Sequence, residues 1–343
     1  MNYEVIITGT LLILCWLILT AADAAVAGLS SLLGGVRFRT VFLWGLLSLL
    51  IPVAAIAYGT LFERNWYQVR EVTIESPSLP GSFDGFIIAQ VSDIHLRSFA
   101  NRPESLRKAV EKINALDPDI VCFTGDLVSM DVSEMEGFED MLKGIKVPVY
   151  SVLGNHDYHI YAGKKDELDE AAIGAKVEEL KARERALGWD LLLNENRIIR
   201  RGADSLAVIG VENTSASDHF PSHGDLQAAM QGTDGCFRIL LSHDPTHWEM
   251  EVVGRDIPLM LSGHTHAMQF SLLGWCPSRY MFKQYRGLYA EGGQSLYVNT
   301  GLGETIFPAR IGARPEITLI TLKKPDNTGS HGRTFPKLRR AGR

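Results

Sequence analysis

The chain has 343 residues, of which 34 are lysine or arginine and 40 are aspartate or glutamate, so its formal net charge at pH 7 is −6. This length is sufficient for one large α/β domain and an additional segment. The net negative charge gives no basis for a nucleic-acid partner, and none is expected. The four cysteines are scattered through the chain, which excludes a disulfide framework and a thiolate metal site.

Two apolar runs lie at the N-terminus. Residues 5–22 form an apolar run of 18 residues and residues 41–61 an uncharged run of 21, close to the roughly 20 residues that span a bilayer. We therefore expect two transmembrane helices and a membrane anchor over residues 1–62. For the first run the alternative is a secretory signal peptide, but the preceding residues Met1 to Glu4 lack a basic n-region. For the second run the alternative is a buried core helix.

These features predict a multi-pass protein of the cell (inner) membrane. The sequence does not decide on which side of the membrane the rest of the chain lies. Arg37 and Arg39 precede the second helix and Arg64 and Arg70 follow it, so the basic residues are balanced between its two ends. Residues 323–343 carry seven basic residues and one acidic residue. A solvated, disordered tail is the simpler interpretation of this composition, and attraction to anionic lipid head groups is the alternative.

Five short clusters rich in Asp, Asn and His occur along the remaining chain. Each follows a run of apolar and β-branched residues, at 86–91, 119–123, 147–153, 237–241 and 257–261, that is typical of a buried strand. Open α/β sheets bind ligands outside the carboxyl ends of their strands, so we expect the clusters to converge. In chain order they are Asp93-Ile94-His95, Gly125-Asp126, Gly154-Asn155-His156-Asp157, Ser242-His243-Asp244 and Gly263-His264-Thr265-His266.

The residue types in these clusters indicate a metal site. Carboxylate, amide oxygen and imidazole ligands suit Mn, Fe, Zn or Mg. Because side chains alternate along a strand, residues two apart lie on the same side. Asp93 and His95 are therefore expected to reach one ion, and so, by the same argument, are His264 and His266. Asp126 is alone in its cluster and is the natural bridge between two ions roughly 3.5 to 4 Å apart. The sequence therefore favours two divalent metal ions.

The order of the five clusters resembles that of the calcineurin-like metallophosphoesterase superfamily, from about residue 86 to about residue 322. The closing stretches 296–303 and 314–320 are similar to the bacterial membrane-associated branch that includes YkuE-type and YaeI-type phosphodiesterases. The resemblance implies an α/β fold over residues 63–322, with two mixed β-sheets in a sandwich flanked by helices. Residue periodicity alone supports only a layered α/β domain.

The resemblance also implies roles for individual residues. One ion would be held by Asp93, His95, Asp126 and His266, and a second by Asp126, Asn155, His243 and His264. A bridging water or hydroxide would be the nucleophile. Asn155 and His156 would bind the phosphate, and His156 would protonate the leaving oxygen while Asp157 orients its imidazole. The alternative for Asp157 is a cap of its own loop.

Several other segments carry expectations. Residues 166–187 have the charge spacing of a surface helix, and strands are expected around residue 198 and over 206–211. The aromatic segment 275–289 either packs on the core or forms a wall or lid for an apolar substrate. Relatives often have glycines after the last histidine, where this chain has Ala267, Met268 and Gln269, so the pocket wall should be more apolar. We expect five further histidines at the surface or the pocket rim: His159, His219, His223, His247 and His331.

The function expected from this evidence is a membrane-anchored, dinuclear metal-dependent phosphoesterase that acts on phosphodiesters, with lipid or cell-envelope substrates favoured. A narrower alternative is a UDP-2,3-diacylglucosamine pyrophosphate hydrolase of lipid A synthesis. Two other classes are a non-catalytic phosphate-ligand binding protein on the same scaffold, and a membrane receptor or scaffold that uses the helices and the basic tail. The sequence does not indicate an oligomeric state.

Overall fold

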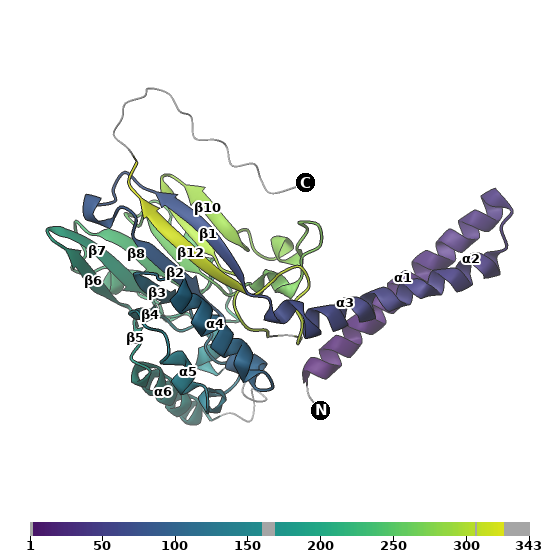
Figure 1. Ribbon diagram of the computed structural model, residues 1–343, viewed down its shortest axis with the longest axis horizontal. Coiled ribbons are helices and arrows are strands. Elements are labelled where there is room, and N and C mark those ends of the chain that lie inside the picture. The colour runs from purple at the N-terminus through teal and green to yellow at the C-terminus, as the bar shows by residue number, and fades with distance from the viewer. Residues whose placement is uncertain (1–2, 160–168, 306, 326–343) are drawn as a thin grey trace, which may run out of the picture.

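The computed structural model describes residues 3–159, 169–305 and 307–325, which form a β-sandwich and an N-terminal helical hairpin (Figure 1). The first sheet has the strand order β1 (Gln68–Glu75), β12 (Glu316–Lys323), β2 (Ile87–Val91), β3 (Ile120–Phe123), β4 (Val149–Ser151) and β5 (Asp190–Leu191). The second has the order β10 (Gly287–Glu291), β11 (Gln294–Val298), β9 (Leu259–Ser262), β8 (Phe237–Leu241), β7 (Asp204–Gly210) and β6 (Glu195–Arg201). Each sheet contains parallel and antiparallel pairs, which confirms the predicted mixed sheets.

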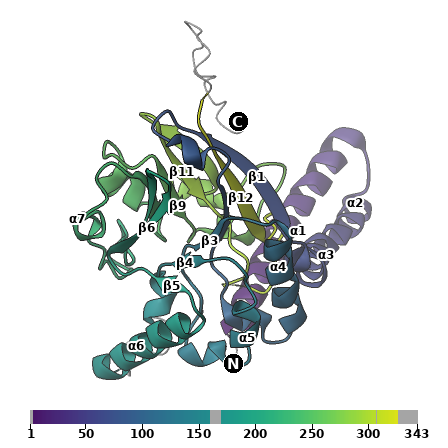
Figure 2. The same cartoon turned by 60° about the vertical axis from the view of Figure 1, so that its left-hand side comes forward.

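The central strands are mainly apolar and show no polar–apolar alternation, because both of their faces are covered. In β2, Ile88 faces the core between the two sheets, whereas Ala89 faces outward onto the helices. The outer face of the first sheet is covered by α4 (Pro103–Ala115) and α6 (Glu170–Ala186), with the short helix α5 (Glu139–Leu142) nearby (Figure 2). The outer face of the second sheet packs on Trp248 and on α7 (Leu226–Ala229).

The predicted strands are confirmed. β2, β3 and β4 are adjacent and parallel in one sheet, and β8 and β9 are adjacent and parallel in the other. All five polar clusters therefore follow the carboxyl ends of neighbouring strands. The predicted helix over 166–187 corresponds to α6, although residues 166–168 lie outside the described residues, as does the predicted tail from residue 326 onward.

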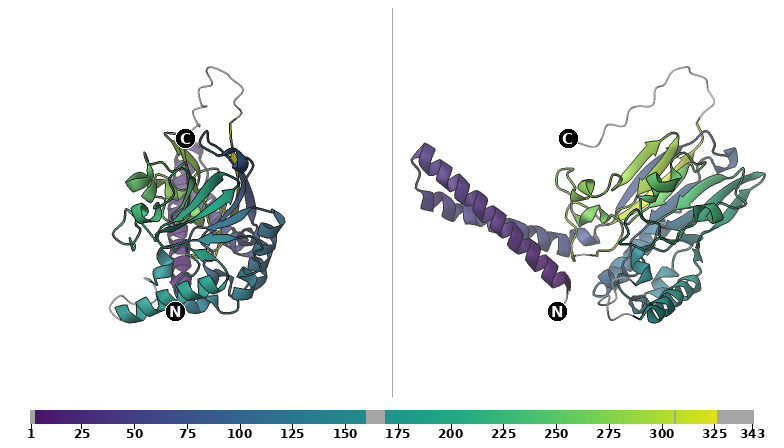
Figure 3. Two further views of the ribbon diagram at one scale, coloured as in Figure 1. Left: turned by 90° about the vertical axis from the view of Figure 1, so that its left-hand side faces the viewer. Right: turned by 180° about the vertical axis from the view of Figure 1, so that it is seen from behind.

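Two N-terminal helical spans are long and apolar enough to cross a membrane, over Val5–Gly34 and Phe38–Asn65. The first is α1 (Tyr3–Gly34), which continues well past residue 22, where the predicted span ends. The second comprises α2 (Phe38–Gly45), a 3-10 turn at 46–49 and α3 (Leu50–Leu61). The hairpin extends away from the sandwich, and both the start of α1 and the end of α3 lie beside the sandwich (Figures 1 and 3).

Polar contacts join the two arms of the hairpin. Ser48 Oγ donates a hydrogen bond to Asp23 Oδ2 at 2.9 Å, and Trp16 Nε1 donates one to the Leu49 carbonyl at 2.9 Å. Gly45 permits this approach, because a Cβ at that position would lie 2.9 Å from Asp23 Cγ. The helices therefore pack as a pair with a defined register.

The end of α3 is attached to the sandwich by buried charges. Glu63 is buried and accepts hydrogen bonds from the Gly312 backbone N–H at 2.9 Å and from Arg314 Nε at 3.3 Å. Gly59 packs so closely on Arg310 that a Cβ there would lie 2.6 Å from the Arg310 carbonyl oxygen. The hairpin is thus fixed to the loop over residues 309–314.

The expectation for the additional histidines is wrong at two positions. His159 and His247 are fully buried, and His247 contacts Ser242 Oγ at 2.9 Å and Glu251 at 3.2 Å. His331 lies outside the described residues.

Candidate metal centre

The polar clusters form tight loops with an unusual backbone. Positive φ angles occur at Asp93 (51°), His95 (47°), Asp126 (60°), His264 (71°) and His266 (48°). A left-handed conformation costs a non-glycine residue roughly 1–2 kcal/mol, and such strain is concentrated at functional sites. These turns aim the side chains at a common point beyond the strand ends.

The first group of ligands comes from β2, β3 and β9. His266 Nε2 lies 3.1 Å from Asp93 Oδ1 and 3.0 Å from His95 Nε2. His95 Nε2 lies 3.5 Å from Asp126 Oδ2. These four side chains are at most 5% exposed. They form the set expected for one ion.

The second group shares the same aspartate. His243 Nε2 lies 3.2 Å from Asp126 Oδ2 and 3.1 Å from Asn155 Oδ1. His264 Nδ1 lies 2.7 Å from the same Asn155 oxygen. Asp126 Oδ2 therefore lies between the imidazoles of the two groups, which is the bridging position expected for it.

The donor atoms fit divalent metal ions. Two ligand atoms that each lie about 2.1 Å from one ion are about 3.0 to 3.4 Å apart at octahedral or tetrahedral angles, and most distances within each group match this range. The other ring nitrogen of His243, Nδ1, donates to the Thr124 carbonyl at 2.7 Å, which leaves Nε2 as a lone-pair donor toward the cluster. The buried carboxylates also require a positive charge nearby.

The electrostatics of the cluster reflect that requirement. Burial alone would lower the pKa of His243, but the adjacent Asp126 carboxylate raises it to about 10. Burial acts to raise the pKa of Asp126, but the His243 imidazole holds it well below its ordinary value. Burial also lowers the pKa of His95. The anionic cluster therefore attracts a proton or a metal ion to the same position.

Two glycines bring the two groups of ligands together. A Cβ at Gly125 would lie 2.5 Å from the Gly154 backbone nitrogen, and one at Gly154 would lie 2.2 Å from Asp126 Oδ1. Gly125 also has a positive φ of 91°. The loops after β3 and β4 can touch only because both positions lack a side chain.

His156 and Asp157 are placed differently from each other. His156 Nδ1 lies 2.7 Å from the Ser129 carbonyl oxygen, and its ring lies edge-on to His95 with a centroid distance of 4.8 Å. The expected contact between Asp157 and the His156 imidazole is not among the hydrogen bonds of the described residues. The Ser129 carbonyl occupies that orienting position instead.

The Asp157 carboxylate binds backbone groups of both loops. It accepts hydrogen bonds from four backbone N–H groups, those of Gly154, Asp126, Leu127 and Val128, at 2.8 to 3.1 Å. Burial, and then the nearby Asp126 carboxylate, raise the pKa of Asp157 to about 7, while these N–H donors act in the opposite direction. The alternative interpretation of Asp157, a loop cap, describes these contacts better than the orienting role does.

A family model described as calcineurin-like phosphoesterase matches residues 86–268, the segment that contains all of these ligands. The chain belongs to this family. It is a phosphate-ester hydrolase with a cluster of Asp and His side chains that could hold metal ions. The resemblance in the order of the clusters is thereby confirmed.

Comparison with curated proteins agrees with this assignment. The chain is 30% identical over 301 residues to the uncharacterized metallophosphoesterase YkuE of Bacillus subtilis, covering 83% of this chain and 97% of YkuE. It is 32% identical over 292 residues to the transmembrane protein with metallophosphoesterase domain of Danio rerio, covering 81% of this chain and 62% of that longer protein. It is 26% identical over 303 residues to the UDP-2,3-diacylglucosamine pyrophosphatase LpxG of Chlamydia trachomatis, covering 74% and 88% of the two chains.

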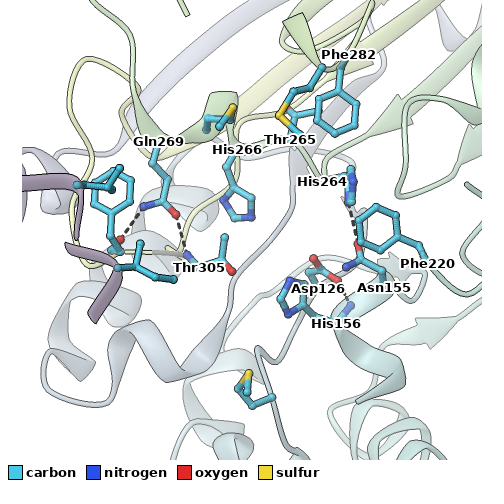
Figure 4. A pocket seen from close by; sticks show the side chains of 16 residues that line it. Asp126, Asn155, His156, Phe220, His264, Thr265, His266, Gln269, Phe282 and Thr305 are labelled. Carbon is cyan, nitrogen blue, oxygen red and sulfur yellow. Dashed lines mark hydrogen bonds between the residues drawn. The ribbon is translucent and has the colours of Figure 1, made fainter. Parts of the chain in front are cut away.

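The phosphoesterase centre opens into a cavity of about 600 Å³ (Figure 4). Apart from the metal ligands and their neighbours, its lining is mainly apolar, with Gln269 and Thr305 as polar residues on one side. The lining residues are Ile7, Leu11, Asp126, Met130, Asn155, His156, Phe220, His264, Thr265, His266, Met268, Gln269, Met281, Phe282, Thr305 and Phe307. The aromatic segment 275–289 serves both expected purposes, because Tyr285 packs against the buried Ala267 while Phe282 forms part of the cavity wall.

The loop after the last histidine ligand retains the backbone that glycines would adopt. Ala267, Met268 and Gln269 have φ angles of 49°, 48° and 53°, so the chain tolerates left-handed turns at three successive non-glycine residues. Met268 lines the cavity, in agreement with the expected apolar wall. Gln269 Nε2 donates to the carbonyls of Phe307 and Ala309 at 2.7 and 2.9 Å, which fixes the opposite rim.

Several residues of this phosphoesterase site have no sequence signal of their own. Arg310 is fully buried, donates to the carbonyls of Gly303 and Ala313, and lies 3.4 Å from His266 Nδ1. Burial lowers the pKa of Arg310 to about 10. His264 is held between the ring edges of Phe220 and Phe282. A single Arg or Phe outside the motifs cannot be distinguished in the sequence from an ordinary surface or core residue.

Proposed function

We propose that this protein is a membrane-anchored phosphodiesterase with two divalent metal ions, acting on lipid or cell-envelope phosphodiesters. The observation that carries the proposal is the convergence of seven expected ligand side chains, four of which line a mainly apolar cavity. One ion would be held by Asp93, His95, Asp126 and His266, and the other by Asp126, Asn155, His243 and His264. Mn, Fe, Zn and Mg all suit this set of ligands.

The side chains around the ions have separate tasks in the proposed reaction. When bound, the two ions supply a nucleophilic water near neutral pH and neutralise charge on the phosphoryl oxygens. The oxygen of water bonds to phosphorus as the bond from phosphorus to the leaving oxygen breaks. His156 binds the phosphate and gives its proton to that leaving oxygen, and the Asn155 amide also contacts the phosphate. The products are an alcohol and a phosphomonoester.

The membrane location in this proposal is supported by the helical hairpin. Both helical spans exceed the roughly 20 residues that cross a bilayer, and they carry many exposed apolar side chains that would be unfavourable in water. A relative from Danio rerio is named as a transmembrane protein. We place the enzyme in the inner membrane as a two-span protein, with the start of α1 and the metal centre on the same side.

A second candidate function is hydrolysis of the pyrophosphate bond in UDP-2,3-diacylglucosamine. It is supported by the similarity to LpxG of Chlamydia trachomatis at 26% identity and by the combination of a metal centre with an apolar cavity. Release of UMP from this lipid would favour the second candidate over a general phosphodiesterase. A non-catalytic binding protein is less well supported, since every ligand side chain and His156 are present.

The proposal is tested by hydrolysis of bis(p-nitrophenyl) phosphate by the full chain in detergent micelles. The protein is stripped of metal and then titrated with Mn²⁺. Asp126→Asn removes the shared carboxylate, and Asp140→Asn makes the same chemical change at a fully exposed side chain. We expect Mn²⁺-dependent turnover that Asp140→Asn retains. Asp126→Asn should lose more than the 10- to 100-fold that is typical of disturbing an outer contact to a ligand.

Absence of turnover with Mn²⁺, Fe²⁺, Zn²⁺ and Mg²⁺ would contradict the proposal and favour a phosphate-ligand binding protein. Equal activity of Asp126→Asn and the unmodified chain would contradict the bridging role of Asp126. Turnover that requires only one equivalent of metal would contradict the dinuclear assignment.

A further inference from the structure

The geometry points to an alkyl-chain site in which the first turns of α1 form one wall of the catalytic cavity. The substrate is then an amphiphilic phosphodiester of the bilayer, whose phosphate binds the metal ions while its chain lies along α1. This inference rests on the proposed function and specifies the substrate class. It also makes an N-terminal helix part of the substrate-binding site.

The contacts of α1 with the cavity carry the inference. Ile7 and Leu11, one helical turn apart, line the cavity together with residues of the metal centre. The ribbon of the N-terminal helix borders the side of the cavity formed by Gln269 and Thr305 (Figure 4). The polar groups of the cavity are concentrated at the metal ligands. Beyond them the lining contains the polar side chains of Gln269 and Thr305 and is otherwise formed by apolar side chains, including Met281 and Phe282.

The length of α1 accounts for this contact. A helix of 32 residues is about 48 Å long, whereas the hydrocarbon core of a bilayer is about 30 Å thick, so about 12 residues extend beyond it, counted over both ends of the helix. Near the N-terminal end of the helix, the apolar residues Ile7 and Leu11 alternate with the polar residues Glu4, Thr8 and Thr10. Ile7 and Leu11 lie beside the sandwich, where apolar side chains need a cover, and the catalytic cavity and a bound alkyl chain supply it.

The surface beside the cavity also favours contact with lipid. Leu272 and Trp275 exchange two backbone hydrogen bonds of 2.9 Å around a two-residue turn. Leu273, at the tip of this turn, has a φ of 49° and a fully exposed side chain. Turns of this kind favour Asn-Gly, so a leucine here is unfavourable both for the backbone and for hydration.

This turn lies on the side from which the hairpin leaves the sandwich. Phe270 forms a β-bridge with Ile311, and Ile311 packs on Gly59 of α3. Figure 3 shows the light-green segment around residues 270–285 on the side of the sandwich that faces the helices. Leu273, the mouth of the cavity and the helices therefore lie near the same surface of the membrane. A lipid is the ligand that such a surface admits.

The test uses a series of p-nitrophenyl alkyl phosphodiesters with methyl, butyl, hexyl and octyl chains, hydrolysed by the full chain with Mn²⁺. We expect kcat/KM to rise about three- to fourfold for each methylene that enters the cavity, and then to level off. The variants are Leu11→Ala on α1 and Met281→Ala on the opposite wall. Leu17→Ala is the matched control, since Leu17 is an exposed leucine of the same helix outside the cavity lining.

The readout is the ratio of kcat/KM for the hexyl ester to that for the methyl ester, which is independent of the amount of active enzyme. Support requires a ratio well above one that falls several-fold in Leu11→Ala and Met281→Ala but not in Leu17→Ala. A ratio near one in the unmodified chain, with the methyl ester still hydrolysed, would overturn the alkyl-chain site and leave the proposed phosphodiesterase intact.

Two other outcomes are decisive. A high ratio that Leu11→Ala leaves unchanged would show that α1 does not form the wall, and would overturn the inference. Failure to hydrolyse even the methyl ester with any divalent metal would overturn the proposed function, and this inference with it.

Discussion

Arg64, just beyond the end of α3, donates a hydrogen bond of 2.7 Å from Nη2 to Oε2 of Glu304 at the rim of the catalytic cavity. Arg102 donates to the same carboxylate at 2.8 and 2.9 Å. All three side chains are at most 13% exposed, and Thr305, the next residue, lines the cavity. The helical hairpin and the rim of the metal centre are thus joined through one buried anion.

We expect Glu304→Gln to lower the free energy of unfolding by about 3 kcal/mol, because two buried guanidinium groups lose their counter-charge. Unfolding of the full chain in micelles by denaturant, followed by tryptophan fluorescence, measures this change. Glu104→Gln is the control, since Glu104 forms an exposed ion pair with Arg107 of the kind that contributes about 0–1 kcal/mol. Similar losses in the two variants would argue against a structural role for the Glu304 cluster.

Asp157→Asn should weaken metal binding more than it changes proton transfer. The amide places an NH₂ group against some of the four N–H donors that hold the loops of Asp126 and Asn155 in register. We expect a 10- to 100-fold loss of Mn²⁺ affinity, measured by metal content after dialysis. Asp225→Asn, at an exposed helix cap, should retain its metal. Normal metal content with an altered dependence on the leaving group would restore the orienting role for Asp157.

His156→Ala should slow the hydrolysis of esters in proportion to how much their leaving group needs a proton. General acid catalysis typically contributes 10²- to 10⁴-fold, so an alkyl leaving group should show a loss of that size. The p-nitrophenyl ester serves as the internal control, since p-nitrophenolate leaves without protonation and should lose much less. Equal losses for both esters would show that His156 binds the phosphate without donating the proton.

Glu184 on α6 makes the stability of the protein depend on pH. It is fully buried, and burial raises its pKa from 4.5 to about 8. The folded chain therefore keeps a proton that the unfolded chain loses above pH 4.5. The resulting stabilisation is complete below that pH and is lost as the pH rises toward 8.

Glu184→Gln removes this titration, so we expect the variant to be about 2–4 kcal/mol more stable than the unmodified chain at pH 8 and similar to it at pH 4.5. Denaturant unfolding at a series of pH values provides the measurement. Glu178→Gln, at an exposed residue of the same helix, should follow the unmodified curve. Parallel curves for Glu184→Gln and the unmodified chain would exclude the buried carboxyl as the source of the pH dependence.

The strand ends of this fold are predictable from the sequence. A parallel strand with both faces covered requires a mainly apolar run, and β2, β3 and β8 have such runs before their polar clusters, interrupted only by Gln90 in β2 and Arg238 in β8. The prediction that these clusters meet follows from the general position of ligands in α/β sheets. This part of the site needs no tertiary information.

The exact placement of the ligands depends on backbone geometry that the sequence does not encode locally. The prediction from strand period that His264 and His266 reach one ion is wrong. Both residues lie in left-handed turns beyond β9, and His266 faces Asp93 while His264 faces Asn155. Asp93 and His95 do belong to the same group of ligands. Both residues lie past Val91, the last residue of β2, so the alternation of side chains along a strand does not explain why they meet.

The contribution of α1 to the cavity wall could not be predicted from the sequence, for a different reason. The helix is apolar on all sides, which is the pattern of a membrane span. Ile7 and Leu11 therefore do not stand out from the apolar residues around them. Only the tertiary arrangement distinguishes them as cavity-lining residues.

A catalytic cavity bordered by Ile7 and Leu11 also bears on what proteolytic shedding would do to this enzyme. A cut between α3 and β1 would release a fragment with every metal ligand but without one side of its cavity. The fragment would still hydrolyse small water-soluble esters and would lose its preference for long-chain substrates. Tethering would then determine which molecules the enzyme selects as well as where it acts.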